Sequence, residues 1–171
     1  MRTILNILGP LTNPAGAPNQ VMGVFHSDLV GIQARVLKML GSRHVMTVHG
    51  QDGLDEITIT GPTFVAELKH DFITEYTIEP GQFGIDVAPI EAIQVKDGAE
   101  SKARVESVLA NEPGPSRDIV VLNAAAALYV SGVVESLWDG VARARDTIAS
   151  GAARAKLEQL ARFTHAFAKA G

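Results

Sequence analysis

The sequence predicts an α/β fold: a partial, mixed, mostly parallel sheet with a β-hairpin region, followed by a C-terminal group of helices. Three observations support this prediction. Two apolar β-type segments, residues 20–25 and 44–49, flank a segment with helical spacing of its apolar residues. Short β-rich segments joined by tight turns follow over residues 57–78. Most of the chain from residue 99 onward again has helical spacing.

The composition indicates one globular domain spanning residues 1–171, which is long enough for a sizeable core. Hydrophobic residues make up 46% and charged residues 20%, unlike a disordered chain. The net charge of −4 shows no basic excess, which argues against a nucleic-acid or anionic-membrane partner. There are no cysteines, no apolar run approaching the ~20 residues of a membrane span and no signal-peptide pattern, so we expect a cytoplasmic protein.

The first segment, residues 2–8, is predicted to be the end of a helix, because its apolar stripe has no capping residue before it. Gly9 and Pro10 stop this helix, and a loop rich in Pro, Gly and Asn follows over residues 11–18. The loop is interpreted either as the rim of a pocket or as a plain connector. A helix this short is marginal by itself, so we expect further structure upstream.

Residues 29–40 are predicted to form the helix of a β-α-β unit, which implies parallel neighbouring strands and a right-handed crossover. Ser27 or Asp28 is the expected N-cap, and Gly41 is the expected glycine after the C-terminus. The expected apolar face consists of Ile32, Val36, Leu37 and Leu40.

The β-rich part contains three predicted strands, residues 57–60, 63–68 and 72–78. Short turns separate them, which favours antiparallel hairpins added to the parallel sheet. Residues 82–95 are expected to be irregular, with a short helix near residues 89–93.

The rest of the chain is predicted to contain four helices, over residues 99–110, 119–130, 136–149 and 152–168. The second is apolar on almost all sides, so it should be central and buried, with Ser116 as a good N-cap before it. Its four alanines should let another element approach closely. The last two helices carry alternating charges that are typical of a solvated face. The first should face the core with Ala103, Val105, Val108 and Leu109.

Three polar residues are interpreted as structural. His26 and His49 fall near the ends of two predicted strands, and neither has an evident carboxylate partner in the sequence. Asn123 lies within the buried helix, where its amide needs hydrogen-bond partners. A packing role therefore outweighs a catalytic one for all three.

The main chemical candidate is the stretch from residue 44 to residue 56, a buried strand followed by a loop with Gly50 and Gly53 and then by Asp55 and Glu56. In open α/β sheets, ligands bind outside the carboxyl ends of the strands. Mg²⁺ commonly takes one or two carboxylates and keeps waters or phosphates in its other positions. The pair is therefore a candidate magnesium site, although adjacent acids in a turn are most often simply solvated.

A second candidate is Arg2, whose guanidinium could bind a carboxylate or phosphate beside the Pro-rich loop, although an arginine near a terminus is ordinarily solvated.

The sequence contains none of the common motifs for nucleotide binding, nucleophilic catalysis or zinc-dependent hydrolysis. There is no G-x-x-x-x-G-K-[ST] phosphate loop, no G-x-G-x-x-G, no G-x-S-x-G and no H-E-x-x-H, and no side chain is visibly set up as a nucleophile.

Three segments, residues 2–15, 49–56 and 117–129, together resemble the anthranilate phosphoribosyltransferase family in order and spacing. The resemblance runs through essentially the whole chain. It implies transfer of the phosphoribosyl group of phosphoribosyl pyrophosphate to anthranilate, with Mg²⁺, in tryptophan biosynthesis. Arg2 matches the family's contact to the anthranilate carboxylate, and Asp55 and Glu56 match its acidic pair for Mg²⁺. A fragment of a pyrimidine nucleoside phosphorylase, which shares the fold, is the main alternative.

The chain also departs from that family, whose members are about twice as long. The family's G-T-G-G-D phosphate loop and its K-H-G-N segment do not occur in this sequence. The expectation is therefore that the chain corresponds to the C-terminal half, without the helical domain that carries the usual homodimer contact. We expect it to be inactive by itself and to be poorly soluble or self-associating, with an unpaired strand edge and an exposed face on helix 119–130. A non-catalytic folded remnant is the remaining alternative.

Overall fold

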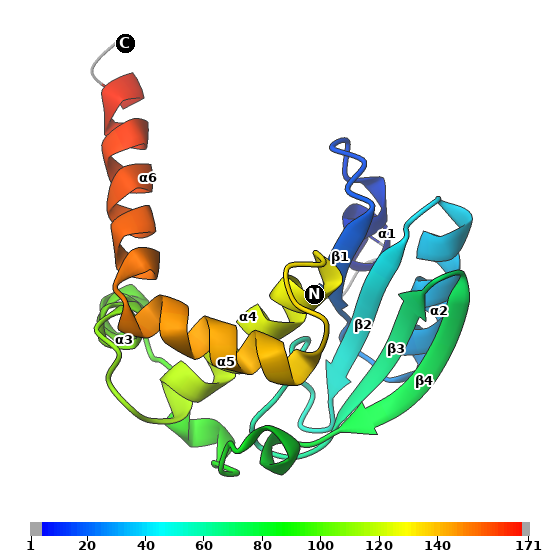
Figure 1. Ribbon diagram of the computed structural model, residues 1–171, viewed down its shortest axis with the longest axis horizontal. Helices are drawn as coiled ribbons and strands as arrows, with labels where there is room; N and C mark the ends of the chain where they lie inside the picture. The colour runs from blue at the N-terminus through cyan, green and yellow to red at the C-terminus, as the bar shows by residue number, and fades with distance from the viewer. Residues whose placement is uncertain (1–4, 169–171) are drawn as a thin grey trace.

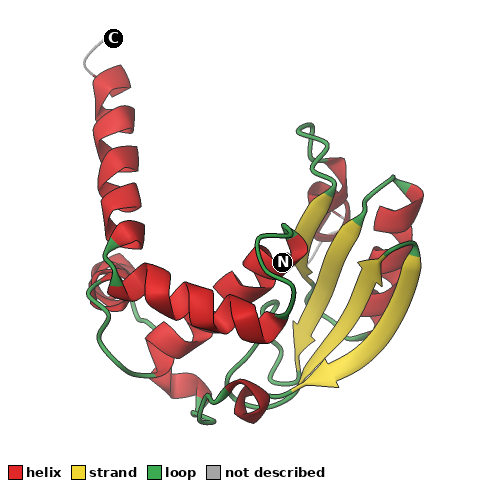
Figure 2. Ribbon diagram, viewed as in Figure 1, coloured by secondary structure: helices red, strands yellow, loops and turns green. Residues whose placement is uncertain are grey.

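The computed structural model describes residues 5–168, in which a mixed four-stranded sheet is covered by helices on both faces (Figure 2). The helix α2 (Asp28–Met39) lies on one face, and α4 (Pro115–Val130) lies on the other, with α5 (Leu137–Ala149) packed against α4 (Figure 1). The predicted α/β class is thus confirmed. No helix among the described residues is long and apolar enough to cross a membrane.

The sheet has the order β1-β2-β3-β4. β1 (Asn19–Gly23) and β2 (His44–Gly50) pair in parallel, which confirms the predicted β-α-β unit. β3 (Thr63–Lys69) and β4 (Phe72–Ile78) add two antiparallel pairings, as the hairpin prediction expects. The antiparallel share is larger than expected for a mostly parallel sheet. β1 lies at one edge of the sheet that the structure describes.

The predicted strand at residues 57–60 is absent from the described sheet. Ile57 and Ile59 are fully buried, but they lie in the loop between β2 and β3. No neighbouring strand pairs with this segment. Asn123 binds both backbone groups of Ile57, Thr63 Oγ1 accepts from Thr58 N at 3.0 Å, and the Ile59 carbonyl accepts from the Ala88 N–H at 3.1 Å. The β-type composition therefore reflects burial on both sides of an extended loop.

The packed face of α2 differs from the predicted one. Of the four predicted residues only Leu37 is buried, whereas Ile32 is 47% exposed and Leu40 is 61% exposed. The sheet instead contacts a stripe of mostly smaller residues, Val30, Gly31, Gln33, Ala34 and Leu37. The prediction followed the largest apolar side chains, but close helix–sheet packing favours the side of the helix with the smaller ones.

The ends of α2 were predicted with mixed success. Gly41 has φ 89° and, with Ser42, closes the helix through backbone bonds to Lys38 and Leu37, as predicted for a C-terminal glycine. Ser27 occupies the N-cap position without a side-chain bond to the helix. The ring of His26 caps the helix instead, because its Nδ1 accepts from the backbone N–H of Asp28 at 3.2 Å.

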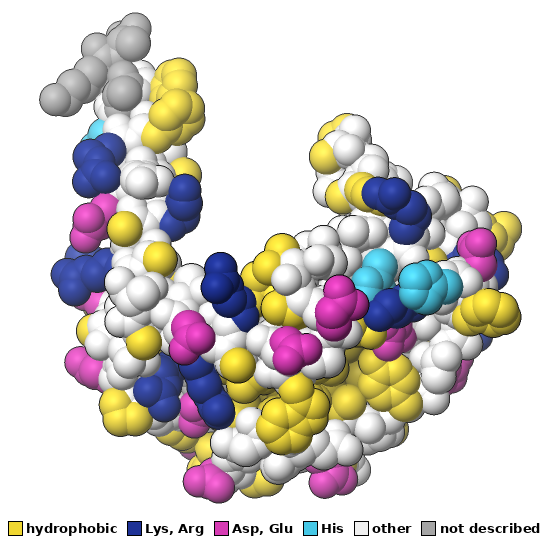
Figure 3. Space-filling view, in the orientation of Figure 1, with side chains coloured by type: hydrophobic (Ala, Val, Ile, Leu, Met, Phe, Trp, Pro, Cys, Tyr) yellow, Lys and Arg dark blue, Asp and Glu magenta, His cyan; other side chains and the backbone are white. Residues whose placement is uncertain are grey.

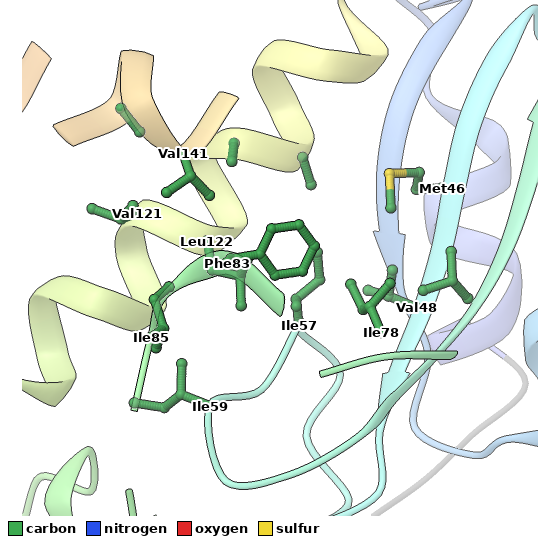
Figure 4. Close-up of a cluster of buried hydrophobic side chains, with 14 of the residues drawn as sticks. Met46, Val48, Ile57, Ile59, Ile78, Phe83, Ile85, Val121, Leu122 and Val141 are labelled. Atoms are coloured by element: carbon green, nitrogen blue, oxygen red, sulfur yellow. The ribbon is translucent and has the colours of Figure 1, made fainter. Parts of the chain in front are cut away.

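The helix α4 is the centre of the larger core, which fills the space between the sheet and α5 (Figure 4). Its alanines allow a close approach, as predicted. A Cβ on Gly140 of α5 would lie 2.7 Å from the carbonyl oxygen of Ala125. The predicted N-cap at Ser116 is wrong, because Gly114 and Pro115 begin the helix and the Ser116 hydroxyl instead accepts from Arg104 at 3.0 Å.

The helix α3 (Gly98–Leu109) begins at Asp97, whose carboxylate accepts from the backbone of Glu100. Of its predicted core residues only Val108 is buried, and Val105 is 48% exposed. The remaining helices are short, except the last, which projects away from the rest of the molecule (Figure 1). They are α1 (Leu5–Leu8), the 3-10 turns η1 (Gly9–Thr12), η2 (Pro80–Phe83) and η3 (Ile90–Ala92), and α6 (Ala152–Ala168).

Candidate functional site

The loop of residues 51–62 places Asp55 and Glu56 beyond the carboxyl ends of the parallel strands β1 and β2. Its contact with β1 is very close. A Cβ on Gly23, the last residue of β1, would lie 1.6 Å from the carbonyl oxygen of Asp55, so only glycine fits there. The backbone of the acidic pair therefore rests directly on the end of β1.

Glycine-containing turns fold the first half of this loop back on β2. The Gly50 N–H donates to the carbonyl of Leu54 at 2.8 Å, and the Gly53 N–H donates to the carbonyl of Gly50 at 2.9 Å. Gly53 has φ 95°, a left-handed conformation that a side chain would strain. The glycine-laced turn predicted from the sequence is therefore present, and it leads directly into the acidic pair.

The carboxylate of Asp52 ties the loop together from within. Its Oδ1 accepts from the Leu54 N–H at 3.0 Å, and its Oδ2 accepts from the hydroxyls of Thr58 and Thr60, each at 2.6 Å. Burial by itself would raise the pKa of Asp52, but these hydrogen bonds outweigh it and hold the pKa below its ordinary value. Asp52 is therefore ionised at neutral pH.

The second half of the loop is held from α4. The Ile57 N–H donates to Asn123 Oδ1 at 3.0 Å, and Asn123 Nδ2 donates to the Ile57 carbonyl at 2.8 Å and to the Ile119 carbonyl at 3.0 Å. The predicted packing role of Asn123 is thus confirmed. Because Ile57 follows Glu56 directly, this clamp fixes the backbone immediately after the acidic pair.

The two acidic side chains are exposed and close enough to influence each other. Although Glu56 is exposed as a residue, partial desolvation of its carboxyl and the neighbouring Asp55 carboxylate raise its pKa above the ordinary value. Residues 5–168 contain no group of three or more His, Cys, Asp or Glu side chains arranged to hold a metal. Two adjacent carboxylates with open surroundings fit Mg²⁺, which commonly takes one or two protein carboxylates and completes its shell with waters or phosphates.

The Pro-rich loop predicted as a pocket rim lies along β1. Together they line a groove whose wall includes Gly23, the residue on which the backbone of Asp55 rests. Arg2, the predicted contact for a carboxylate, lies outside the described residues. The groove is lined by Gly9, Pro10, Thr12, Asn13, Pro14, Gln20, Val21, Met22 and Gly23.

The two histidines near the strand ends have structural partners. His49 is buried, and its Nδ1 lies 2.7 Å from the carbonyl of Val24, which confirms the structural interpretation. His26 caps α2, and its Nδ1 lies 3.6 Å from a carboxylate oxygen of Asp28, a partner two residues away that the sequence interpretation missed.

Sequence reasoning also missed a polar network at the opposite end of the sheet. Glu67 of β3 accepts from the hydroxyls of Tyr76 and Tyr129, each at 2.8 Å, and its Oε1 lies 3.0 Å from His44 Nε2. Lys69 donates to the Tyr129 hydroxyl at 3.0 Å. The network could have been predicted from Glu67 itself, a charged residue at an inward-facing position of a strand.

The sequence also contained a signal for the hydrogen bonds of Asp52. Two threonines, Thr58 and Thr60, follow the Asp-Gly turn at alternate positions.

The fold is thus an α/β domain with a candidate cation-binding loop at the carboxyl ends of its parallel strands. The chain belongs to the glycosyl transferase family, since the model of that family's a/b domain matches residues 1–154. It is 59% identical over 168 residues to the anthranilate phosphoribosyltransferase of Laribacter hongkongensis, covering 98% of this chain and 49% of that protein. It is also 59% identical over 159 residues to the anthranilate phosphoribosyltransferase of Chromobacterium violaceum, covering 93% of this chain and 46% of that protein.

Solved structures show the same relationship. The crystal structure of anthranilate phosphoribosyltransferase from Thermus thermophilus superposes with a TM-score of 0.85 at 39% identity, covering 93% of this chain and 47% of that chain. The enzyme from Saccharomyces cerevisiae in complex with PRPP and Mg superposes with a TM-score of 0.79 at 27% identity, covering 92% of this chain and 46% of that chain. The chain therefore spans about half the length of the curated relatives it matches.

Proposed function

We propose that this chain supplies the part of an anthranilate phosphoribosyltransferase that carries the acidic loop, residues 51–62 with Asp55 and Glu56. The reaction transfers the phosphoribosyl group of phosphoribosyl pyrophosphate to anthranilate, giving N-(5-phosphoribosyl)anthranilate and pyrophosphate, in tryptophan biosynthesis. The observation that carries the proposal is the Asp55–Glu56 pair, held at the end of β1 by Gly23 and Asn123. The relatives that carry this enzyme's name support the choice of substrate.

In this proposal Asp55 and Glu56 would hold Mg²⁺, which when bound supplies positive charge against the pyrophosphate that leaves. The chain's own part is to present two carboxylates on a backbone that is already ordered, so that little entropy is lost when the site fills. Arg2 is proposed to bind the anthranilate carboxylate through its guanidinium fork. Positioning and charge stabilisation then suffice, and no protein nucleophile is required.

Residues 1–171 are proposed to act as one domain in a homodimeric cytoplasmic enzyme. We do not expect turnover from this chain by itself, because the sequence contains no G-T-G-G-D phosphate loop. A coupled assay for phosphoribosylanthranilate with the purified 171-residue chain tests this expectation. Robust turnover would refute it. Saturable binding of a pyrimidine nucleoside without binding of anthranilate would favour the phosphorylase alternative.

The metal role is tested with Mn²⁺ as a spectroscopic substitute for Mg²⁺. We expect free Mn²⁺, measured by electron paramagnetic resonance, to decrease on addition of the wild-type chain, and the double variant Asp55→Asn/Glu56→Gln to bind at least about tenfold more weakly, since both carboxylates are lost. The matched control is Asp86→Asn/Glu91→Gln, which removes two exposed acids outside the loop. Equal binding by the wild type and the Asp55/Glu56 variant would remove the support for the proposed site.

A further inference from the structure

Asp52 lies three residues before Asp55, and its carboxylate accepts three hydrogen bonds from the loop itself. Both oxygens accept hydrogen bonds, Oδ1 from the Leu54 N–H at 3.0 Å and Oδ2 from two threonine hydroxyls at 2.6 Å each. Hydrogen bonds from hydroxyls to an ionised carboxylate are short and strong. A carboxylate with these three partners organises the loop.

The partners of Asp52 bracket the acidic pair in the sequence. Leu54 directly precedes Asp55, and Thr58 follows Glu56 by two residues. One carboxylate thus connects the backbone before the pair to a fully buried side chain after it.

Gly50 makes this connection possible. A Cβ on Gly50 would lie 2.5 Å from Asp52 Oδ1 and 3.1 Å from Thr58 Cβ, so a side chain there would displace the carboxylate. The last residue of β2 therefore leaves room for the Asp52 side chain to fold back over the strand end. These hydrogen bonds involve neither of the two external supports of the loop, Gly23 and Asn123.

We infer that Asp52 is a positioning residue for Asp55 and Glu56: acting through Thr58 and Thr60, it holds the two carboxylates on one ordered loop for a divalent cation. The inference rests on the proposed metal role of the pair and adds a residue that does not contact the cation. Side chains that order metal ligands in this way typically change metal affinity by about 10–100-fold when they are removed.

The test uses the full 171-residue chain and Mn²⁺ alone, with electron paramagnetic resonance for affinity and NMR line broadening for location. We expect Asp52→Asn to weaken Mn²⁺ binding by about tenfold or more, and to spread the paramagnetic broadening beyond the amides of Asp55 and Glu56. Asp86→Asn, an exposed acid outside the loop, should bind as the wild type does.

A pair of variants at Thr60 keeps the test decisive if Asp52→Asn does not fold. Thr60→Val removes one hydroxyl donor to Asp52 and should weaken Mn²⁺ binding, whereas Thr60→Ser retains the hydroxyl and should restore it. Thr60→Ser is the matched control, because it changes the side chain at the same position and keeps the hydroxyl. Thermal melting of each variant identifies the folded ones.

The outcomes are separable. Weaker binding by Asp52→Asn and Thr60→Val, with wild-type binding by Thr60→Ser, supports the inference. If these variants bind as tightly as the wild type, the inference is overturned while the proposed function stands. If the wild-type chain itself neither binds Mn²⁺ nor shows broadening at Asp55 and Glu56, the proposed metal role fails, and the positioning role for a cation fails with it.

Discussion

Asn123 of α4 pairs with both backbone groups of Ile57, accepting from its N–H at 3.0 Å and donating to its carbonyl at 2.8 Å. These two residues are far apart in the sequence, and their pairing attaches the acidic loop to the central helix. Ile57 itself is completely buried. The loop therefore has no access to water at this point that could replace the amide of Asn123.

Replacing Asn123 with alanine should destabilise the protein by about 2–6 kcal/mol, because it leaves two buried backbone groups unpaired at about 1–3 kcal/mol each. Urea unfolding measures the change. Val120→Ala, on the 44% exposed side of the same helix, is the control and should change the free energy of unfolding by less than about 0.5 kcal/mol. A similarly small effect for Asn123→Ala would show that the clamp contributes little.

Replacing Gly23 with alanine should displace the acidic loop, because the new Cβ would lie 1.6 Å from the Asp55 carbonyl oxygen. We expect a loss of about 1–3 kcal/mol of stability or more, together with weaker Mn²⁺ binding, since neither backbone can yield without local rearrangement. Gly61→Ala is the matched control, as a Cβ there meets no atom within 4 Å. Wild-type stability and Mn²⁺ binding in Gly23→Ala would contradict the close contact.

The network around Glu67 should make stability depend on pH on the acid side. Burial raises the pKa of Glu67, but hydrogen bonds from Tyr129 and Tyr76 and the contact with His44 outweigh burial, so the folded-state pKa lies below the ordinary 4.5. A carboxyl whose pKa is lowered on folding contributes stability that is present above its unfolded pKa. That contribution is lost as the pH falls through the folded value.

We therefore expect the free energy of unfolding, measured in urea, to decrease as the pH falls below about 4.5. Glu67→Gln should be less stable at neutral pH and should show a shallower decrease, because it cannot titrate. Glu75→Gln, an exposed acid on the neighbouring strand, should retain the wild-type slope. Identical slopes in Glu67→Gln and the wild type would exclude Glu67 as the source.

The apolar surface of α6 should cause self-association. Four large apolar side chains on this helix are exposed, and Figure 3 shows hydrophobic atoms along it: Leu157 at 44%, Leu160 at 57%, Phe163 at 65% and Phe167 at 66%. The exposed surface predicted on helix 119–130 is smaller, because α4 buries five residues and exposes mainly Val120. Contiguous apolar surface of this kind promotes association in water.

Sedimentation velocity at rising protein concentration measures this association. Leu160→Gln/Phe163→Gln should shift the chain toward monomer, since both residues are exposed and their replacement disturbs no core contact. Arg162→Gln, between them on the same helix, is the control and should leave the association unchanged. A monodisperse monomer for the wild-type chain would contradict the expectation.

Local patterns in the sequence were sufficient for most elements. The period of the apolar residues located all four strands of the described sheet, the β-α-β crossover and the long helices. They were not sufficient for the packed face of α2 or for residues 57–60, where burial on two sides resembles a strand. Apolar character identifies what is buried, but it does not identify which neighbour buries it.

The acidic loop likewise combines features that the sequence predicts with features that only the folded structure decides. The glycines and the Asp55–Glu56 pair are contiguous in the chain, so the sequence alone determined the turn and the candidate ligands. Only the tertiary structure decided that Gly23 must be glycine, that Asn123 closes on Ile57 and that the loop stands at the end of β1. The physical reason is that turns depend on neighbouring residues, whereas close approach and the pairing of buried amides depend on segments that meet only when the chain folds.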